Sequence, residues 1–234
     1  ILCTQKCLIQ QSVFRHIIVP SRYAARLNDH LQTTVIRYGI DPITEYRTDK
    51  KFETKRKFGY RQDDIIVSRI GAITPEKRAI DNILLAKIFP EYQFVIGGIT
   101  PHQQYFDYVW NEAQHLDNVR FMLNLSVKDR EDLLNISDVY AYPTDAEAFA
   151  ISILEAMSIG LPVITYDNTA LPEFESIVKC KHGNITEVAQ KLRNLIENKD
   201  LWQKISQNEA EEFQSQYTMS AYADKVDRLY KEMS

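Results

Sequence analysis

The chain has 234 residues, of which 44% are hydrophobic and 26% are charged, and its formal net charge is -4. This hydrophobic fraction can form a packed core, and the near balance of charge argues against nucleic acid as a partner. The cysteines (Cys3, Cys7 and Cys180) are an odd number without metal-ligand spacing, which favours plain thiols in a reducing compartment over a disulfide framework.

Short apolar runs rich in β-branched residues predict strands along the chain. They cover residues 16–20, 34–38, 64–70, 92–97, 118–123, 139–143 and 162–166. Segments with helical periodicity lie between them, such as the one that carries Ile80, Ile83 and Leu84. This alternation predicts an α/β fold in which a mostly parallel, Rossmann-like sheet has helices on both faces.

The pattern changes after Asp167, where residues 185–198, 201–217 and 220–233 have helical periodicity and predict an α-rich C-terminal end. Residues 42–61 are polar and few of them are apolar, so we expect a linker there. The predicted domains are residues 1–41, as the end of an N-terminal domain, and residues 62–234, as a C-terminal domain.

The sequence lacks both glycine-rich phosphate motifs, the G-x-G-x-x-G fingerprint and the Walker loop, and it contains only seven glycines. A phosphate bound to this sheet would therefore depend on helix N-termini and cationic side chains. No apolar run reaches the roughly 18 residues of a membrane span, and no signal-peptide core begins the chain. We expect a cytoplasmic protein, with peripheral membrane association left open.

Residues 140–163 carry the most informative pattern. A strand ends near Pro143, a loop carries Glu147, and a helix is expected to begin near Phe149. Ligands collect at the carboxyl ends of strands in open α/β sheets, and a helix N-terminus offers free N–H groups to an anion. Glu155 lies six residues into the helix, about 9 Å along its axis. Two carboxylates that flank an anion site suit a nucleoside diphosphate sugar.

A simpler interpretation exists for each glutamate. Ser152, Glu155 and Ser158 recur every three residues, so Glu155 could belong to a solvated helix face. Glu147 alone could be a loop carboxylate stabilised by the helix dipole.

Residues 14–230 resemble the C-terminal part of GT-B-type retaining glycosyltransferases, the family of sucrose, trehalose and glycolipid mannosyl transferases. Glu147 and Glu155 match the paired-glutamate motif of that family, with seven residues between them, and residues 156–163 match its continuation. Arg69 and Lys77 resemble the family's Gly-Arg and Lys-Gly pair. Residues 16–21, 35–41 and 118–121 resemble further landmarks, in the family's order along the chain.

The resemblance implies metal-independent retaining transfer of a hexose from a UDP- or GDP-linked donor to a sugar or lipid-linked acceptor. It implies that Arg69 and Lys77 neutralise the departing diphosphate, and that Glu147 binds the transferred sugar as a positioning residue rather than a nucleophile. The remaining donor-binding positions would be Ala148, Phe149, Ala150, Ile151 and Glu155, and no metal or other cofactor is expected. Taken alone, Arg69 would be a surface cation after a strand and Lys77 a polar residue in a helix's first turn.

Several positions depart from the family pattern. Ser68 and Arg78 replace glycines, and the separation of Arg69 from Lys77 exceeds the common spacing by about three residues. Tyr38 replaces a frequent asparagine, and Ala150 replaces a glycine, so its methyl group would restrict the approach of the sugar to the helix start. Residues 168–169 occupy a loop that often contains glycine and faces the phosphate site.

Complete family members carry an N-terminal domain of comparable size, and the acceptor binds in the cleft between the domains. Only about 41 residues precede the linker here, so we expect a part of a longer enzyme whose final helix crosses back to the missing domain. One alternative is a non-catalytic sugar-nucleotide-binding subunit that works with a separate partner. Another is a GT-B-fold sugar-nucleotide epimerase, which is less favoured because no histidine lies beside the glutamate motif.

Overall fold

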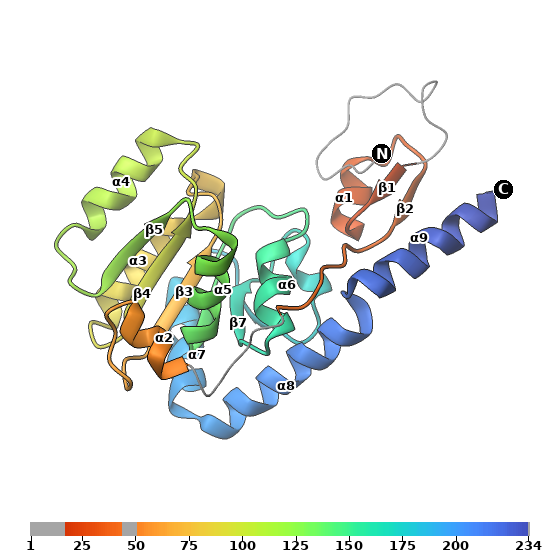
Figure 1. The fold of residues 1–234 in the computed structure, drawn as a ribbon. Coiled ribbons are helices and arrows are strands. Elements are labelled where there is room, and N and C mark those ends of the chain that lie inside the picture. Colours follow the sequence, from red (N-terminus) through yellow and green to blue (C-terminus); the bar gives the residue numbers. More distant parts are fainter. Residues whose placement is uncertain (1–16, 44–50, 234) are drawn as a thin grey trace.

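The computed structural model describes residues 17–43 and 51–233, so Cys3, Cys7 and His16 lie outside it. Its first unit is small and consists of β1 (Ile17–Val19), α1 (Arg22–Leu27) and β2 (Thr33–Val35), in which the two strands are parallel (Figure 1). The strand, helix and strand expected before the linker are therefore confirmed within the described residues.

The second unit contains a six-stranded, entirely parallel sheet within the described residues. Its strands are β3 (Ile66–Ile70), β4 (Gln93–Gly98), β5 (Val119–Leu123), β6 (Val139–Ala141), β7 (Val163–Tyr166) and β8 (Val178–Cys180). They are arranged in the order β5-β4-β3-β6-β7-β8, so the chain changes direction across the sheet between β3 and β6. The sequence did not predict β8, because three residues with a polar Lys179 at the centre give no apolar run.

Helices cover both faces of the sheet, which confirms the α/β fold class (Figure 1). They are α3 (Ala79–Ile88), α4 (Gln103–Ala113), α5 (Val127–Ile136), α6 (Ile151–Ser158) and α7 (Ile185–Glu197). Leu133 and Ile153 belong to one core cluster, whereas Leu85 and Leu192 belong to another. The central strands are almost continuously apolar because both of their faces are buried.

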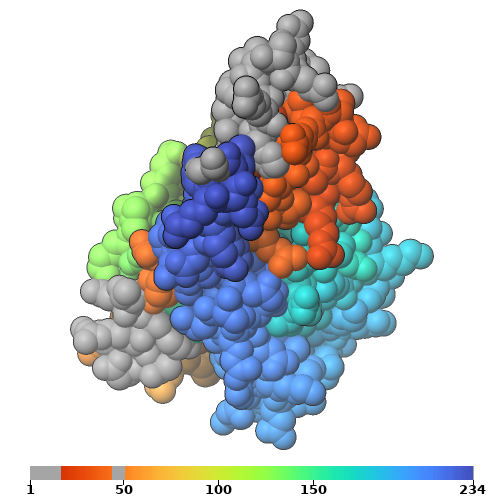
Figure 2. All heavy atoms as spheres, turned by 90° about the vertical axis from the view of Figure 1, so that its right-hand side faces the viewer, coloured from red at the N-terminus to blue at the C-terminus, as the bar shows by residue number. Residues whose placement is uncertain are grey.

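The chain ends in α8 (Lys199–Gln216) and α9 (Met219–Met233), which confirms the α-rich C-terminal end. Figure 2 shows these helices as a ridge beside the first unit. The chain between the two units is hydrogen-bonded to the junction of α8 and α9. The N–H of Ile40 donates to the carbonyl of Tyr217 (2.9 Å), and the carbonyl of Ile40 accepts the N–H of Met219 (3.1 Å). A Cβ at Gly39 would lie 2.3 Å from the carbonyl oxygen of Thr218, so this close approach requires glycine.

Among the described residues, no helix combines the length and the apolar character of a membrane span.

The predicted linker contains a helix that its polar composition did not indicate. Residues 44–50 lie outside the described residues, but α2 (Lys51–Lys57) packs against α5. Two of its lysines form ion pairs: Lys57 lies 2.9 Å from Asp132 of α5, and Lys51 lies 2.8 Å from Asp138, just after α5. Ion pairs and long aliphatic stems allow a polar segment to pack on the domain surface. The domain boundary at this segment stays a prediction.

Asn118 is one of the residues that carry the family resemblance, and its role in the structure is to hold turns together. Its buried amide nitrogen lies within 3.1 Å of the carbonyl oxygens of Ala86, Phe89 and Tyr92. These contacts satisfy carbonyls at the C-terminal end of α3 and in the turn that leads to β4. Asn118 therefore fixes the connection between α3 and β4.

Glu209 of α8 is fully buried and holds the beginning of β7, because its carboxylate accepts the N–H of Val163 at 2.9 Å. Burial raises the pKa of Glu209 well above its ordinary value of 4.5, and the negative charge of Glu212 acts in the same direction. The folded state therefore favours the protonated carboxyl group. The contribution of Glu209 to the free energy of unfolding is complete below the ordinary pKa and is lost as pH rises through the raised folded-state pKa.

We expect the wild-type chain to lose free energy of unfolding relative to Glu209→Gln as pH rises above 4.5, because only the wild type carries the titrating group. Urea unfolding followed by circular dichroism over a pH series measures both. Glu211→Gln, on the exposed face of the same helix, serves as the control and should keep the wild-type pH dependence. Equal pH slopes for Glu209→Gln and the wild type would contradict the assignment.

Candidate functional site

The candidate site lies where the order of the sheet reverses. Arg69 is at the carboxyl end of β3, and the short helix η2 (Pro75–Lys77) follows shortly after it. β6, which pairs with β3, ends next to this point, and the loop after it carries Glu147 and leads to α6. The two connections leave neighbouring strands in opposite directions across the sheet and open a crevice there, which is the position of ligands in open α/β folds.

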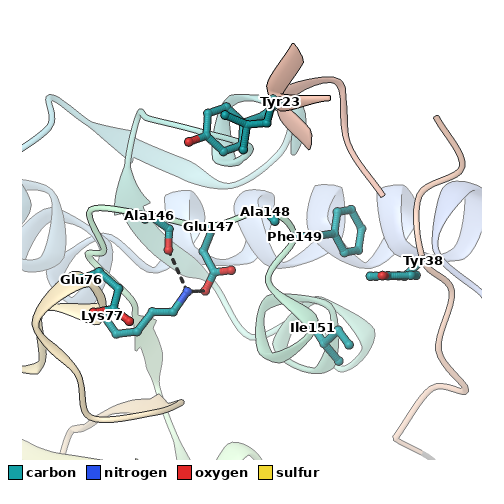
Figure 3. Close-up of a pocket in the computed structure, with 10 residues that line it drawn as sticks. Tyr23, Tyr38, Glu76, Lys77, Ala146, Glu147, Ala148, Phe149 and Ile151 are labelled. Atoms are coloured by element: carbon teal, nitrogen blue, oxygen red, sulfur yellow. Dashed lines mark hydrogen bonds and ion pairs between the residues drawn. The ribbon is translucent and has the colours of Figure 1, made fainter. Parts of the chain in front are cut away.

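Lys77 and Glu147 form an ion pair at the centre of the crevice. The Lys77 ammonium donates to Glu147 Oε1 at 2.6 Å and to the carbonyl of Ala146 at 2.7 Å (Figure 3). The buried hydroxyl of Tyr142 donates to the same carboxylate oxygen at 2.9 Å. The N–H of Glu147 donates to the hydroxyl of Thr169 at 3.1 Å, so main chain and side chain are both held. One Glu147 oxygen, Oε2, has no hydrogen bond within the described part of the chain.

A pocket of about 520 Å³ opens over this pair, between the first unit and the α/β unit. Its lining residues are Tyr23, Leu27, Tyr38, Glu76, Lys77, Ala146, Glu147, Ala148, Phe149 and Ile151. Figure 3 shows Tyr23 of α1 above the loop that carries Glu147, with Tyr38 beside Phe149. Of the residues predicted from the sequence, Lys77, Glu147, Ala148, Phe149 and Ile151 thus share one wall. Arg69, Ala150 and Glu155 are not among the lining residues.

Arg69 is fully buried, so it is not the surface cation that its position after a strand alone would suggest. Its guanidinium donates to the carbonyl of Lys77 at 3.2 Å and lies 5.3 Å from the centroid of the Tyr142 ring. Its Nε and Nη1 atoms have no hydrogen-bond partner. A buried cation without a counter-charge is strongly stabilised by any anion that comes close to it.

Glu155 is also buried rather than solvated, because α6 turns this side chain toward α5. One carboxylate oxygen lies 3.2 Å from the guanidinium of Arg130. Burial raises the pKa of Glu155, and the positive charge of Arg130 opposes the rise. The solvated-face interpretation of the helix pattern is therefore wrong for Glu155.

The helix after the loop begins at Ile151, two residues later than the sequence indicated. Ala150 precedes it in an extended conformation, and its methyl group offers no hydrogen bond to the first turn. The N–H groups of a first turn have no intrahelical partner, so those of Ile151 and Ser152 can bind an anion.

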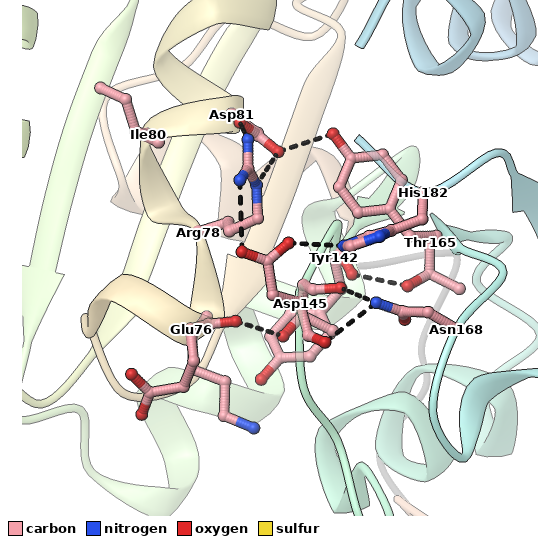
Figure 4. A network of polar contacts seen from close by, with 12 residues as sticks. Glu76, Arg78, Ile80, Asp81, Tyr142, Asp145, Thr165, Asn168 and His182 are labelled. Atoms are coloured by element: carbon pink, nitrogen blue, oxygen red, sulfur yellow. Dashed lines mark hydrogen bonds and ion pairs between the residues drawn. The ribbon is translucent and has the colours of Figure 1, made fainter. Parts of the chain in front are cut away.

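The backbone is left-handed at Arg78, where the resemblance leads one to expect glycine, and at Thr169, in the loop that often contains glycine: φ is 45° and 50°. Glycine adopts such values without strain, whereas other residues need compensating contacts. Arg78 obtains them through paired contacts with Asp81 (2.7 and 2.9 Å) and an ion pair with Asp145 at 3.2 Å (Figure 4). These contacts raise the pKa of Arg78 above its ordinary value.

The same network fixes the loop that carries Glu147. Asp145 donates its N–H to the carbonyl of Glu76 at 2.8 Å, and the Asn168 amide donates to the carbonyls of Thr144 and Asp145 at 3.0 Å. His182 approaches the Asp145 carboxylate at 2.7 Å (Figure 4). The loop is thereby attached to η2 and to the loop after β7, which sets the distance between Lys77 and Glu147.

No group of three or more histidine, cysteine, aspartate or glutamate side chains with the geometry of a metal site is found in residues 17–43 and 51–233. The residues that sequence reasoning missed are Tyr23, Leu27, Glu76 and Ala146 on the pocket wall, and Tyr142 and Arg130 behind it. Tyr142 lies inside the informative segment, but Tyr23 and Leu27 come from a distant part of the sequence and carry no local signal.

Known proteins resemble this chain in sequence and in fold. The model of the family "Glycosyl transferases group 1" matches residues 50–212, which is more than half of the chain. The chain belongs to this family.

Two bacterial proteins are among the relatives that this chain is similar to in sequence. The chain is 20% identical to the capsular polysaccharide biosynthesis glycosyltransferase CapM of Staphylococcus aureus, over 97% of this chain and 62% of that protein. It is 25% identical to the UDP-Gal:alpha-D-GlcNAc-diphosphoundecaprenol alpha-1,3-galactosyltransferase of Escherichia coli, over 69% of this chain and 42% of that protein. The chain thus spans about 62% and 42% of the lengths of these curated relatives.

A solved structure shows the same fold. HepE of Anabaena, crystallised in complex with UDP and glucose, matches with a TM-score of 0.85 at 19% identity, over 93% of this chain and 63% of that one. The fold predicted from the resemblance to GT-B-type enzymes is therefore confirmed.

A double-mutant cycle tests how strongly Lys77 and Glu147 interact. We expect Lys77→Met, Glu147→Gln and the double variant to give a coupling free energy of about 1 to 3 kcal/mol in urea unfolding, because the pair is largely shielded from solvent. The Lys87–Glu112 pair is the matched control: its N···O distance is also 2.6 Å, but both of its side chains are 41% exposed. It should give less than about 1 kcal/mol. Equal coupling free energies in the two pairs would show that burial in the crevice does not strengthen the Lys77–Glu147 interaction.

Proposed function

We propose that this chain supplies the donor site of a retaining glycosyltransferase. The enzyme would transfer a hexose from a UDP- or GDP-linked sugar to a sugar or lipid-linked acceptor without a metal ion. The observation that carries the proposal is the Lys77–Glu147 pair beneath an open pocket at the reversal of the sheet. Cation, carboxylate and the uncapped first turn of α6 together offer a partner for each polar part of a diphosphate sugar.

The charge of the donor diphosphate is met by Lys77, by the N–H groups at the start of α6 and by Arg69 behind them. On donor binding, the Lys77 ammonium exchanges the Glu147 carboxylate for a phosphate oxygen, and Glu147 then accepts hydrogen bonds from sugar hydroxyls. The buried Arg69 guanidinium, which has two unpartnered donor atoms, strengthens the local positive potential. This group would stabilise the negative charge that develops on the leaving nucleoside diphosphate, as a metal ion does elsewhere.

The proposed roles of Glu147 and Glu155 follow from where each side chain lies. Glu147, on the wall of the pocket, orients the transferred sugar while the acceptor hydroxyl attacks the same face from which the nucleotide leaves. Glu155 would accept hydrogen bonds from the ribose. The positive charge of Arg130 opposes the rise in the pKa of Glu155 that burial causes, and so favours the ionised carboxylate that would accept these hydrogen bonds.

Isothermal titration calorimetry of the full chain with UDP and with GDP, in the presence of EDTA, tests the donor site. We expect saturable binding of one nucleotide, weakened about tenfold or more by Glu155→Ala and by Arg69→Ala. The first variant removes a charge-assisted contact with the ribose, and the second removes the positive potential at the phosphates. Circular dichroism of each variant verifies that it is folded, and Lys77→Met provides a further test should Arg69→Ala unfold.

Two matched controls are available far from the site. Arg193 also lies over an aromatic ring, at 5.1 Å from Phe89, and Glu112 is an exposed glutamate with an ion-pair partner. Arg193→Ala and Glu112→Ala should leave the affinity unchanged. An absence of binding by either nucleotide, or binding that all these variants leave intact, would refute the proposed donor site.

A further inference from the structure

A second pocket, of about 540 Å³, lies beside the first and carries an unusual concentration of arginines. Its lining residues are Arg22, Arg26, Arg37, Thr169, Pro172, Glu173 and Glu175. The arginines come from α1 and from the chain that follows β2, and the remaining residues come from the segment after β7. The pocket is therefore formed by both units, as the first one is.

The two carboxylates of this pocket balance only part of the charge of its three arginines. Glu173 accepts the N–H of Tyr23 at 3.1 Å and pairs with Arg37 at 3.6 Å, so its charge is already engaged. Glu175 is exposed. Three arginines against two glutamates leave the lining residues with one net positive charge. The Nε atom of Arg37 is buried without a hydrogen-bond partner.

Arg22 and Arg26 have the least compensation. They lie four residues apart on α1, so their side chains project from the same helix face, where like charges destabilise a helix. Within the described part of the chain, neither guanidinium has a carboxylate within 4.0 Å. An anion between them would remove this repulsion, and the planar guanidinium matches a phosphate with two parallel hydrogen bonds.

This pocket is coupled to the candidate donor site through two neighbours. Tyr23, adjacent to Arg22 on α1, lines the first pocket. Thr169 lines the second, and its hydroxyl accepts the N–H of Glu147. A group held by the arginines would therefore lie next to the sugar that Glu147 is proposed to bind, on the side of the first unit.

We propose that Arg22, Arg26 and Arg37 form an anion subsite that binds a phosphate group of the acceptor. The inference rests on the proposed glycosyl transfer, because it is that reaction which brings an acceptor to this side of Glu147. The arginines would anchor the phosphate while the acceptor hydroxyl extends past Tyr23 toward the donor. The phosphate could be that of a soluble ester or that of a lipid, since the two share the chemistry that guanidinium recognises.

Inorganic pyrophosphate is the probe for the subsite. The full chain is titrated with it by calorimetry while UDP or GDP, whichever binds, saturates the donor site. We expect Arg22→Glu combined with Arg26→Glu to weaken pyrophosphate about tenfold or more, because two charge-assisted contacts are lost. Arg56→Glu combined with Lys204→Glu makes the same change of charge at exposed positions elsewhere and should leave the affinity unchanged. Thermal unfolding verifies that both variants are folded.

Co-sedimentation with phosphatidylcholine vesicles, with and without phosphatidic acid, separates the two sources of phosphate. Binding to the phosphatidic acid vesicles that requires Arg22 and Arg26 would support a lipid acceptor, whereas pyrophosphate binding alone would support a soluble one. Pyrophosphate affinity that the Arg22 and Arg26 substitutions leave unchanged, or that the control substitutions reduce equally, would overturn the subsite. A failure of the donor site would show itself differently, as an absence of nucleotide binding while the arginines still bind pyrophosphate.

Discussion

The reversal of strand order between β3 and β6 is the constraint on which the candidate site depends. The two strands pair directly, but the chain leaves them toward opposite edges of the sheet, so their carboxyl-end connections diverge and leave a crevice. Arg69 and Lys77 reach it from one side, and Glu147 reaches it from the other. An ion pair between residues 70 positions apart in the sequence is thus a consequence of topology. The first unit then closes the crevice into a pocket with Tyr23 and Tyr38.

Two strained positions show how the loops around this crevice are kept in place. Arg78 and Thr169 adopt left-handed backbone conformations, and both belong to segments in which the family resemblance leads one to expect glycine. Strain at a ligand site persists only when surrounding contacts compensate for it. The ion pairs of Arg78 with Asp81 and Asp145 provide them on one side, and the hydrogen bond between Thr169 and Glu147 contributes on the other. The side chains at these two positions therefore supply contacts that tie the loop of Glu147 to its neighbours.

The sequence predicted the sheet well because buried parallel strands are short, apolar and β-branched, which is a local property. It missed β8 and did not separate α2 from the linker, because Lys179 interrupts the first and the lysines of the second are paired only in the folded chain. For the site, the motif around Glu147 and the basic pair Arg69 and Lys77 predicted residues of one wall of the pocket, among them Lys77 and Glu147. The opposite wall and the burial of Arg69 depend on how the two units pack, and no local pattern encodes that.

The structure of the chain bound to the nucleotide that it prefers tests the central claim most directly. The claim is that Lys77 and Glu147 neutralise each other in the free protein and separate when the donor diphosphate arrives. A crystal structure with UDP or GDP should place the Lys77 ammonium about 3 Å from a phosphate oxygen, with the phosphates at the first turn of α6 and Glu147 released toward the pocket. A nucleotide bound elsewhere, with the Lys77–Glu147 ion pair intact, would contradict the account.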